Sequence, residues 1–586
     1  MTQTDTSTLD NHSASPAARL AWILLILATL YICYFHNLGA IGFVGPDEPR
    51  YAWIARDMVE SGDWVTPRLF GKPWFEKPVL YYWGAALSFK VFGVSEASAR
   101  FPSAFAALFA TLAMAWLAWR VYGAETARWL LLLLPTTVGM IGFSHAAATD
   151  MPFAGMLTIA MVCAARLLGL IPRSSSPTSF TYSTSFISFF FGFFLGLAVL
   201  AKGPAAIILS GGAVLLWAAL TKRYRDAFRC LHRVAIASFC LTALPWYILC
   251  ARRNPDFFRV FIIEHNFKRY LTPEFQHIQP FWFYIPILLI AFAPWTLALL
   301  WAALYGGLRY LPTRRLNPMT ILLLCWSIFC LVFFSISKSK LPSYILPTIP
   351  VISLLIVRCF VCLVSNDEKS FRWPHFALGF TISVLSGLWL VGTRHLFQPT
   401  RTDRQVLDSI ALSLFLFGLA NLMLAFRRNT SGRQGTASAF CVVPILVLVY
   451  LFPLISAPWR AYLSTGKTIA SNLAGKQIPL DQLYLARMPR SQEYCLNFYL
   501  HHELKTWNKE DPQDGYLLMP SKHCGYFVSQ PLVCSDNPLE VESGGWFVYR
   551  VERRASAGGL GAFGGSGGGN DRSGSGGGRT DNGQPR

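Results

Sequence analysis

Long apolar runs separated by short charged or polar segments dominate the pattern of hydrophobic positions along this chain. A helix that crosses the core of a bilayer needs about 20 apolar residues. We count thirteen runs that meet or approach that length, with centres near residues 30, 109, 136, 162, 193, 212, 242, 293, 327, 353, 385, 416 and 448. The pattern therefore predicts a polytopic α-helical membrane protein with about thirteen transmembrane helices.

Two stretches make the count sensitive to interpretation. The runs near 193 and 212 almost abut at Ala201-Lys202-Gly203-Pro204, and the apolar stretch 79–93 is interpreted as interfacial. The apolar runs stop near residue 460, after which short alternating segments such as "GGWFVYRVE" favour strands. The predicted domains are a disordered cytoplasmic N-terminus (1–19), a membrane body (20–460), a small α/β domain (465–553) and a flexible Gly/Ser-rich tail (554–586).

Composition agrees with a membrane location, because 53% of the 586 residues are hydrophobic and only 14% are charged. Cytoplasmic loops collect Lys and Arg, and three loops are strongly basic: "TKRYRDAFRCLHR" (221–233), "LRYLPTRR" (308–315) and "RRNTSGR" (427–433). This places the N-terminus inside. An odd number of spans then places the first charged loop and the C-terminal domain on the outer side, which is periplasmic in a two-membrane bacterium. The net charge of +20 partly reflects this topology and requires no nucleic acid.

Cysteine placement argues against a disulfide scaffold. Most of the thirteen cysteines lie inside or beside apolar runs, where a thiol acts as a small apolar group. In the outer C-terminal region, the spacing of Cys524 and Cys534 allows a bridge but does not establish one.

Charged side chains gather in the predicted outer loops, chiefly 41–97, 251–280 and 337–344. These loops, with the short segment "HAAATDMP", contain Asp47, Glu48, Arg50, Tyr51, Glu76, Lys77, His145, Asp150, His265, Lys268, Arg269, Lys338, Lys340 and Tyr344. Because all lie on one side of the predicted membrane, they can converge. Lys and Arg compensate the charge of a lipid phosphate that is bound and then expelled. A carboxylate can orient an acceptor or take its proton.

Each of these residues also has a simpler interpretation, since polar side chains at a membrane boundary are often only solvated or anchor a helix end. His145 is expected to be structural. Lys202, in "AKGP", fits a helix anchor as well as it fits a functional role.

Several motifs in one order carry a family resemblance: "PDEPRYAWIARDMVESGDWVTPRLFGKPWFEKPVLYYW", "TDMP", "AKGP", "EHNFKRY", "QHIQPFWFYIP" and "FFSISKSKLPSYILP". Together they resemble the bacterial 4-amino-4-deoxy-L-arabinose (aminoarabinose) transferases. That family belongs to the GT-C superfamily of membrane glycosyltransferases, which use polyprenyl-phosphate sugars and include the protein O-mannosyltransferases. The resemblance runs from about residue 20 to 350.

The resemblance implies roles for individual residues. Asp47 would be the principal active-site carboxylate and Asp150 a second one. Glu76 and His265 resemble a pair that holds a divalent metal such as Zn²⁺, although two such residues are more often a hydrogen-bonded pair. The residues expected to bind the carrier phosphate or substrate are Lys77, Arg50, Tyr51, Arg269, Lys338, Lys340 and Tyr344.

The implied reaction moves aminoarabinose from undecaprenyl phosphate to a phosphate of lipid A at the periplasmic face of the bacterial inner membrane, with inversion. A monomer is expected, with the lipid-linked donor, lipid A and membrane lipids as its partners. Two alternatives stay open from sequence. One is transfer of another polyprenyl-linked sugar to a glycan, lipid or protein. The other is a flippase or transporter, which predicts charged residues along a pathway within the spans.

Overall fold

The computed structural model describes residues 16–172, 183–268, 278–297, 316–366, 442–455, 465–476 and, with short gaps, 478–553, together with scattered helical residues elsewhere. The chain forms two compact units. Unit 1 comprises Met1–Gln477 and Met488–Glu503, and unit 2 comprises Ile478–Arg487 and Leu504–Arg586. Each unit is described separately below.

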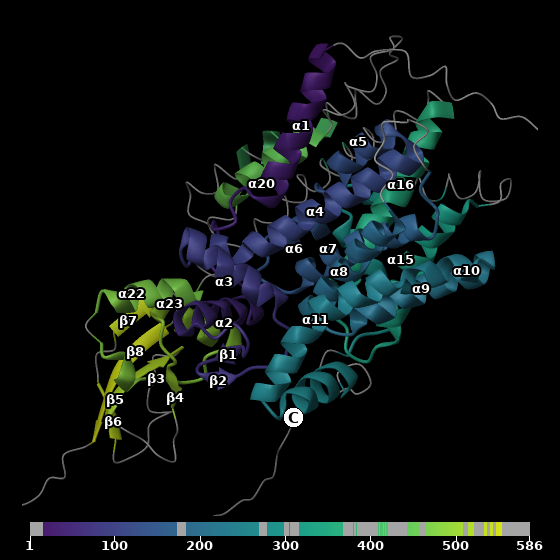
Figure 1. Ribbon diagram of the computed structural model, residues 1–586. Coiled ribbons are helices and arrows are strands. Elements are labelled where there is room, and N and C mark those ends of the chain that lie inside the picture. The colour runs from purple at the N-terminus through teal and green to yellow at the C-terminus, as the bar shows by residue number, and fades with distance from the viewer. Residues whose placement is uncertain are drawn as a thin grey trace, which may run out of the picture. The chain divides into compact units, whose positions relative to one another are not determined.

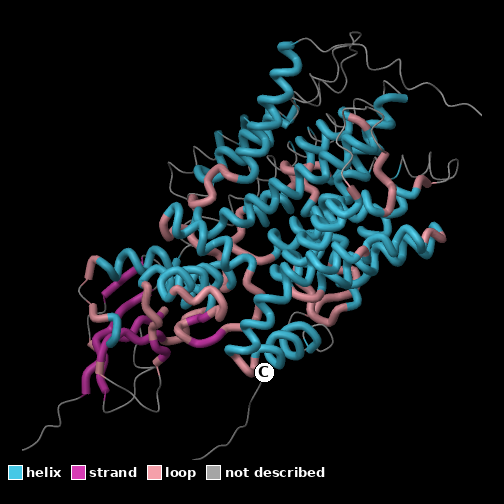
Figure 2. Tube along the Cα trace, viewed as in Figure 1, coloured by secondary structure: helices cyan, strands magenta, loops and turns pink. Residues whose placement is uncertain are grey.

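Unit 1 is almost entirely helical (Figures 1 and 2). Its first helices are α1 (Pro16–Tyr34), α2 (Asp47–Ser61), α3 (Leu80–Phe92), α4 (Glu96–Tyr122), α5 (Ala124–Leu133), α6 (Val138–Ser144), α7 (Asp150–Leu167), α8 (Thr184–Lys202), α9 (Ala205–Thr221), α10 (Tyr224–Ala227) and α11 (Arg233–Arg253). The later ones are α13 (Tyr284–Ala291), α15 (Pro318–Ile336), α16 (Ile349–Asn366), α20 (Val443–Ile455), α22 (Thr465–Ala474) and α23 (Arg490–Leu500). Shorter or differently wound elements are η2 (Phe228–Leu231), the π-helix η3 (Arg259–Lys268), η4 (Pro342–Thr348) and the hairpin β1 (Arg68–Leu69) with β2 (Lys72–Pro73).

Seven helices within the described residues are long and apolar enough to cross a membrane. An eighth candidate is the pair α5 and α6, which is bent by 62°. These helices support the prediction of a polytopic membrane protein. The count of thirteen stays a prediction, since the runs centred near 385 and 416 fall where the structure describes only scattered helical residues.

Two local features decide where helices start and stop. The first described helix runs from Pro16, a few residues before the predicted start of the membrane body, and proline is accommodated in a first helical turn, where its missing N–H costs no intrahelical hydrogen bond. The abutting runs near 193 and 212 are separate helices. The break occurs at Gly203, whose φ of 85° disfavours a side chain, followed by Pro204 at the start of α9.

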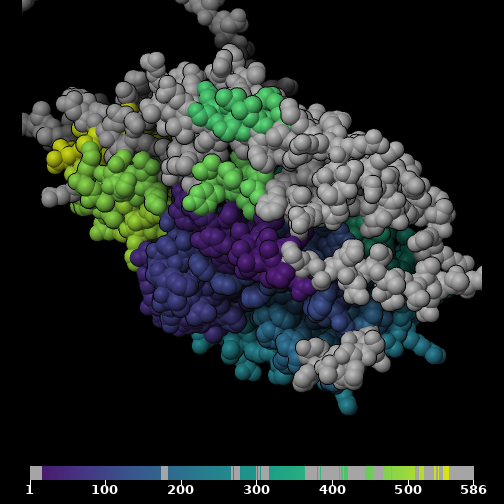
Figure 3. All heavy atoms as spheres, turned by 90° about the horizontal axis from the view of Figure 1, so that it is seen from above, coloured from purple at the N-terminus to yellow at the C-terminus, as the bar shows by residue number. Residues whose placement is uncertain are grey.

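Close packing of small residues holds the centre of unit 1 together. Helices α4, α7, α8 and α11 lie side by side (Figure 1). A Cβ added at Gly155 would lie 2.7 Å from the Ala106 carbonyl oxygen, and one at Gly192 would lie 2.0 Å from that of Ala235. Glycines at these crossings let helix backbones approach, as is common in transmembrane bundles. In contrast, α1 exposes Leu20, Ile23, Leu24, Leu27 and Tyr31, and its purple side chains form part of the surface in Figure 3.

The charged loop 41–97 is ordered. It folds as α2, the β1–β2 hairpin and α3. Both helices pack against each other and bury Tyr51, Tyr81 and Tyr82 among their neighbours. The loop therefore presents its charged residues from a packed support.

Unit 2 contains a six-stranded mixed sheet in the order β4-β3-β5-β8-β6, with β7 also paired to β8. Its strands are β3 (Leu483–Leu485), β4 (Lys505–Thr506), β5 (Gly515–Met519), β6 (Leu532–Cys534), β7 (Leu539–Glu542) and β8 (Trp546–Arg553). Alternate residues of β5 and β8, such as Leu517 and Tyr549, form its core. The predicted strand in "GGWFVYRVE" is confirmed as β8. Cys534 is disulfide-bonded, and its expected partner Cys524 lies outside the described residues.

The predicted C-terminal range 465–553 covers two kinds of segment. Helices α22 and α23 belong to unit 1, whereas the strands belong to unit 2. The chain leaves the sheet after β3, forms α23 in unit 1, and returns at β4. Buried apolar residues of α23, Cys495 and Phe498, join the core of unit 1 and explain this assignment.

Candidate active site

The first acidic pair of the chain stands at the N-terminus of α2. Gly45, whose φ is 69°, makes the turn that leads into this helix, and Asp47 and Glu48 occupy its first turn. Negative charge is favoured there, because the unpaired N–H groups at a helix start are positively polarised. The side chain of Asp47 is 52% exposed, so it faces open space rather than the core.

Arg50 joins Asp47 to the segment just after the β1–β2 hairpin, where Glu76 lies. One guanidinium nitrogen bonds the Asp47 carboxylate, another lies 3.5 Å from Glu76, and Nε donates to the Pro46 carbonyl at 3.1 Å. The Arg50 side chain is only 8% exposed. Burial alone would lower its pKa, but Glu76, Tyr51 and Asp47 raise it, so the guanidinium stays charged.

Two aromatic rings enclose the same guanidinium. Its central carbon lies 5.4 Å from the ring centre of Trp74 and 5.4 Å from that of Tyr494. Both distances are within the range of a cation–π interaction. Tyr494 belongs to α23, so a helix more than four hundred residues along the chain helps to fix Arg50.

A second charged group surrounds Asp150, at the start of α7. The Lys202 ammonium, from the end of α8, pairs with the Asp150 carboxylate. The carboxylate also bonds the Ser343 side chain and attracts the Lys77 ammonium. The Lys202 nitrogen in turn lies 4.6 Å from the centre of the Tyr344 ring.

Adjacent residues in "WFEKP" connect the two groups. Glu76 lies beside Arg50, which also holds Asp47, while Lys77 attracts Asp150. The chain thus assembles three carboxylates, Asp47, Glu76 and Asp150, with cations between and beside them. They come from α2, the segment after the β1–β2 hairpin and α7, and α8 adds a cation. Such a site can bind phosphate through its cations and orient a second reactant through its carboxylates.

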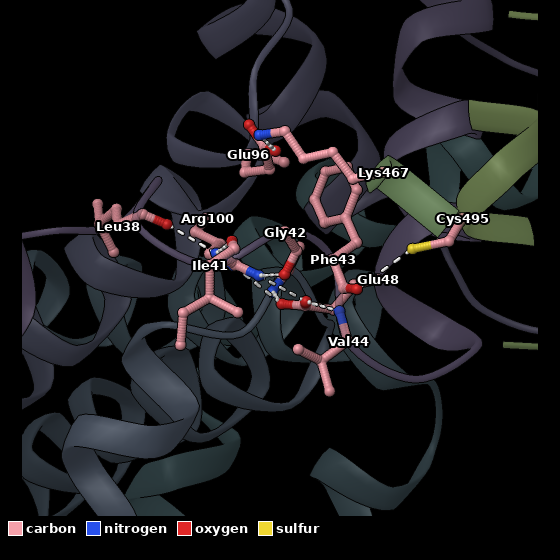
Figure 4. A network of polar contacts seen from close by, with 12 residues as sticks. Leu38, Ile41, Gly42, Phe43, Val44, Glu48, Glu96, Arg100, Lys467 and Cys495 are labelled. Atoms are coloured by element: carbon pink, nitrogen blue, oxygen red, sulfur yellow. Dashed lines mark hydrogen bonds and ion pairs between the residues drawn. The ribbon is translucent and has the colours of Figure 1, made fainter. Parts of the chain in front are cut away.

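Glu48, the neighbour of Asp47, has a different environment (Figure 4). Its carboxylate accepts hydrogen bonds from Arg100 at 2.7 and 3.1 Å and from the backbone N–H groups of Val44 and Ala147 at 2.7 Å each. Arg100 also donates to the carbonyls of Leu38, Ile41 and Gly42. This network fixes the loop before α2 to α4 and to the loop before α7.

Comparison with known proteins places this arrangement in a family. The undecaprenyl phosphate-alpha-4-amino-4-deoxy-L-arabinose arabinosyl transferase of Edwardsiella ictaluri (strain 93-146) is 32% identical over 432 residues, which cover 72% of this chain and 75% of that protein. This chain belongs to the same transferase family. A similarly named protein of Photorhabdus laumondii is 32% identical over 419 residues, covering 70% of this chain and 72% of that protein.

A family model and solved structures describe the same kind of fold. Residues 20–261 match the model described as dolichyl-phosphate-mannose-protein mannosyltransferase. The crystal structure of ArnT from Cupriavidus metallidurans bound to undecaprenyl phosphate has a TM-score of 0.71 at 22% identity, covering 93% of this chain and 99% of that one. The crystal structure of the same protein in the apo state has a TM-score of 0.70 at 23% identity, covering 91% of this chain and 98% of that one. At this identity the structures establish the GT-C fold.

The other predicted phosphate-binding residues occupy varied positions. Lys340 is buried and donates to the carbonyls of Gln279 at 3.0 Å and Ser337 at 2.7 Å, whereas Lys338 is exposed. Burial, followed by the charge of Lys338, lowers the pKa of Lys340. Tyr51 is buried against Tyr81 and Tyr82, and burial raises its pKa well above the usual range. Arg269 lies outside the described residues.

The two residues expected to hold a metal line one cavity of about 450 Å³. Glu76 and His265 share this cavity with Asp256 and Arg259. Within the described residues, no three His, Cys, Asp or Glu side chains are arranged to hold a metal ion. Catalytic zinc sites typically use three protein ligands. Glu76 and His265 supply two such donors, and a divalent metal held by them stays a prediction.

The structure gives His145 and Lys202 different roles. The ring nitrogens of His145 each lie 3.0 Å from a backbone carbonyl, that of Ile141 or of His36, and these contacts fit the expected structural role. Lys202 ends its helix and also neutralises Asp150, so it joins the site. Sequence reasoning missed Trp74 and Tyr494 as neighbours of Arg50. No sequence signal connects Tyr494 with a residue of the first loop.

Proposed function

We propose that this transferase moves 4-amino-4-deoxy-L-arabinose from undecaprenyl phosphate to a phosphate group of lipid A. Membership of the family supports a glycosyltransferase with this lipid-linked donor. The observation that carries the proposal for the site is the linked pair of groups, Asp47–Arg50–Glu76 and Lys77–Asp150–Lys202. A transport function lacks support, because the curated relatives are named as transferases.

Cations at the second group suit the carrier phosphate. Lys77 and Lys202 lie around Asp150, with Tyr344 beside the Lys202 ammonium. As the bond to the sugar breaks, negative charge grows on the phosphate oxygens, and positive groups then stabilise it more than they did in the ground state. Arg269, next to the last described residue of η3, stays a predicted member of this group.

The chemical step is a direct displacement. An oxygen of the acceptor phosphate attacks the anomeric carbon of the sugar, and the bond from that carbon to the carrier phosphate breaks. The electron pair leaves with undecaprenyl phosphate, and the anomeric configuration inverts. An acceptor phosphate is already anionic near neutral pH, so Asp47 orients a reactant or stabilises developing positive charge on the sugar without needing to remove a proton.

Several predicted properties accompany this proposal. The site and the C-terminal domain would lie on the periplasmic side of the inner membrane, with a cytoplasmic N-terminus, and the protein would act as a monomer. A divalent metal at Glu76 and His265 also stays a prediction, for metal analysis of the purified wild type and His265→Ala to test. A cationic sugar on lipid A would lower the negative surface charge and weaken binding of polymyxin and other cationic peptides.

Lipid A provides the direct test. Wild type, Asp47→Asn and Glu60→Gln are expressed in a bacterium that makes the donor but lacks its own transferase, and lipid A is measured by mass spectrometry. Glu60 is a matched control, because it is an exposed carboxylate on the same helix that pairs with Arg56 and His501. The wild type and Glu60→Gln should add aminopentose, whereas Asp47→Asn should lose it at equal protein levels.

Two outcomes would count against the proposal in different ways. Unmodified lipid A with folded wild-type protein would point to another acceptor or sugar. Full modification by Asp47→Asn would remove Asp47 from the catalytic site while leaving the reaction itself supported.

A further inference from the structure

An apolar groove lies in unit 1 beside the basic segment 221–233, away from the charged site. It measures about 350 Å³ and is bordered by α8, α9, α10, η2 and α11. Its lining is apolar and includes Phe191, Leu195, Gly211, Leu215 and Phe228. The Ser210 hydroxyl donates to the Ala206 carbonyl of its own helix at 2.8 Å, and the other hydroxyl in the lining belongs to Tyr224. The rest of the lining offers the contacts that a hydrocarbon chain makes.

Several lining side chains are exposed. Leu215, Phe228 and Leu231 are each more than 60% exposed among the described residues. An unfilled concavity would lose van der Waals contacts along its lining, so a ligand chain that fills it gains them. Tyr224 also lines the groove, at its α10 border, where the amphipathic ring of a tyrosine suits the level of lipid headgroups.

The charge around this end selects the headgroup. Segment 221–233, which includes α10 and η2, contains five Lys or Arg residues and a single acidic one, Asp226. Asp226 already pairs with Arg223 at 2.6 Å and with Arg229 at 3.1 Å. Arg223 also donates to the Leu168 carbonyl at 3.2 Å, which joins this segment to the end of α7. The remaining positive charge favours an anionic headgroup.

We propose that this groove binds one acyl chain of an anionic phospholipid, with its headgroup held by the basic residues next to Tyr224, notably Lys222 and Arg225. The site is separate from the proposed catalytic site and does not depend on the transferase reaction. Basic pockets between transmembrane helices recognise anionic lipids in this manner.

The glycines of the groove allow a precise obstruction. A Cβ added at Gly211 would meet no atom within 4 Å, so Gly211→Leu should fill the groove without displacing the backbone. The neighbouring Gly212 is unsuitable, because its Cβ would lie 2.0 Å from the ring of Phe329. Gly142→Leu is the matched control: it places the same side chain at another open helical glycine, on α6.

Native mass spectrometry of the purified full-length protein provides the test. The protein is incubated with phosphatidylglycerol or with phosphatidylcholine of the same acyl chains, and bound lipid is counted. Phosphatidylglycerol should bind more, and Gly211→Leu should remove that excess while Gly142→Leu keeps it. The double variant Lys222→Gln with Arg225→Gln should weaken the binding of phosphatidylglycerol by roughly fivefold for each cation removed. Arg252→Gln, at the other end of α11, should leave it unchanged.

Three results would overturn the proposal. Equal binding of the two phospholipids would remove the role of charge. Unchanged lipid binding by Gly211→Leu would show that the lipid binds elsewhere. If that variant failed to fold, unchanged lipid binding by the double charge variant would show the same. Displacement of phosphatidylglycerol by undecaprenyl phosphate, blocked by Gly211→Leu, would make the carrier lipid the occupant instead.

Discussion

Asp47 and Glu48 are adjacent in the sequence, and each pairs with an arginine, yet they belong to different regions of the molecule. Asp47 is 52% exposed and shares Arg50 with Glu76 in the open site. Glu48 is 9% exposed, and Arg100, at 5%, holds it within a network of backbone groups. Successive residues at a helix start point in different directions, so one faces the site and the other faces the core.

The two neighbouring carboxylates therefore have different roles, although both are acidic residues in the same helical turn. The buried pair is surrounded by fixed backbone donors and acceptors, so it holds three chain segments together. The open pair leaves carboxylate oxygens accessible to a substrate. Variants of the two arginines and of their surroundings can therefore test whether support and catalysis are separate.

Arg100→Leu should have the largest effect. It leaves the Glu48 charge buried without its main partner, which typically costs about 3–5 kcal/mol of stability. Little monodisperse protein should survive purification in detergent, as measured by size-exclusion chromatography. Adding Glu48→Gln removes the uncompensated charge and should recover part of the yield. A wild-type yield from Arg100→Leu alone would contradict the structural role.

Arg50→Leu should fold but lose activity. Because Arg50 orients Asp47 and Glu76, its loss should lower the rate of aminoarabinose transfer on the order of 10²-fold. The rate is measured with purified enzyme and donor, and the denaturation temperature is compared with that of the wild type. A strongly lowered denaturation temperature would place Arg50 with Arg100 as a supporting residue.

Tyr494→Leu should have a smaller effect on the same site. Loss of one ring from the buried Arg50 guanidinium removes about 1–2 kcal/mol, so kcat/KM should fall roughly five- to thirtyfold. Tyr494→Phe keeps the ring and should retain activity. If both variants lost activity equally, the hydroxyl rather than the ring would be the important group.

Substitution of Asp63 should have the smallest effect on stability. This carboxylate is partly exposed and pairs with Arg68 and Arg253, outside both regions compared above. Burial alone would raise its pKa, but the N–H groups of Val65 and Thr66, with Arg253 and Arg68, lower it below the ordinary 3.8. Its stabilisation should therefore be present above pH 3.8 and be lost as the pH falls through the lower folded-state pKa. Because the ion pairs of Asp63 with Arg253 and Arg68 are partly exposed, we expect them to contribute less than about 1 kcal/mol to the free energy of unfolding.

Asp63→Asn measures this contribution. The variant should denature at a slightly lower temperature than the wild type at pH 7, and the difference should shrink towards pH 3. A difference that grew at low pH would have the wrong sign for a carboxylate with a lowered pKa.

Much of the site was predictable because its residues sit in loops beside apolar runs, where charge is costly unless it has a use. Asp47, Arg50, Glu76, Lys77, Asp150 and Tyr344 all reach the two linked groups. The roles of Lys340 and Lys202 were harder to assign. Whether a lysine binds a ligand, a carbonyl or a carboxylate depends on which segments pack beside it.

The sequence by itself determined the helical membrane class, the family and the set of charged loops, because hydrophobic run length and local motifs carry that information. Only the tertiary structure decided that Glu48 belongs to the core, that Lys202 neutralises Asp150, and that Tyr494 reaches Arg50 from a distant helix. These contacts join residues far apart in the chain. Their partners are fixed by helix packing, which no local pattern of residues specifies.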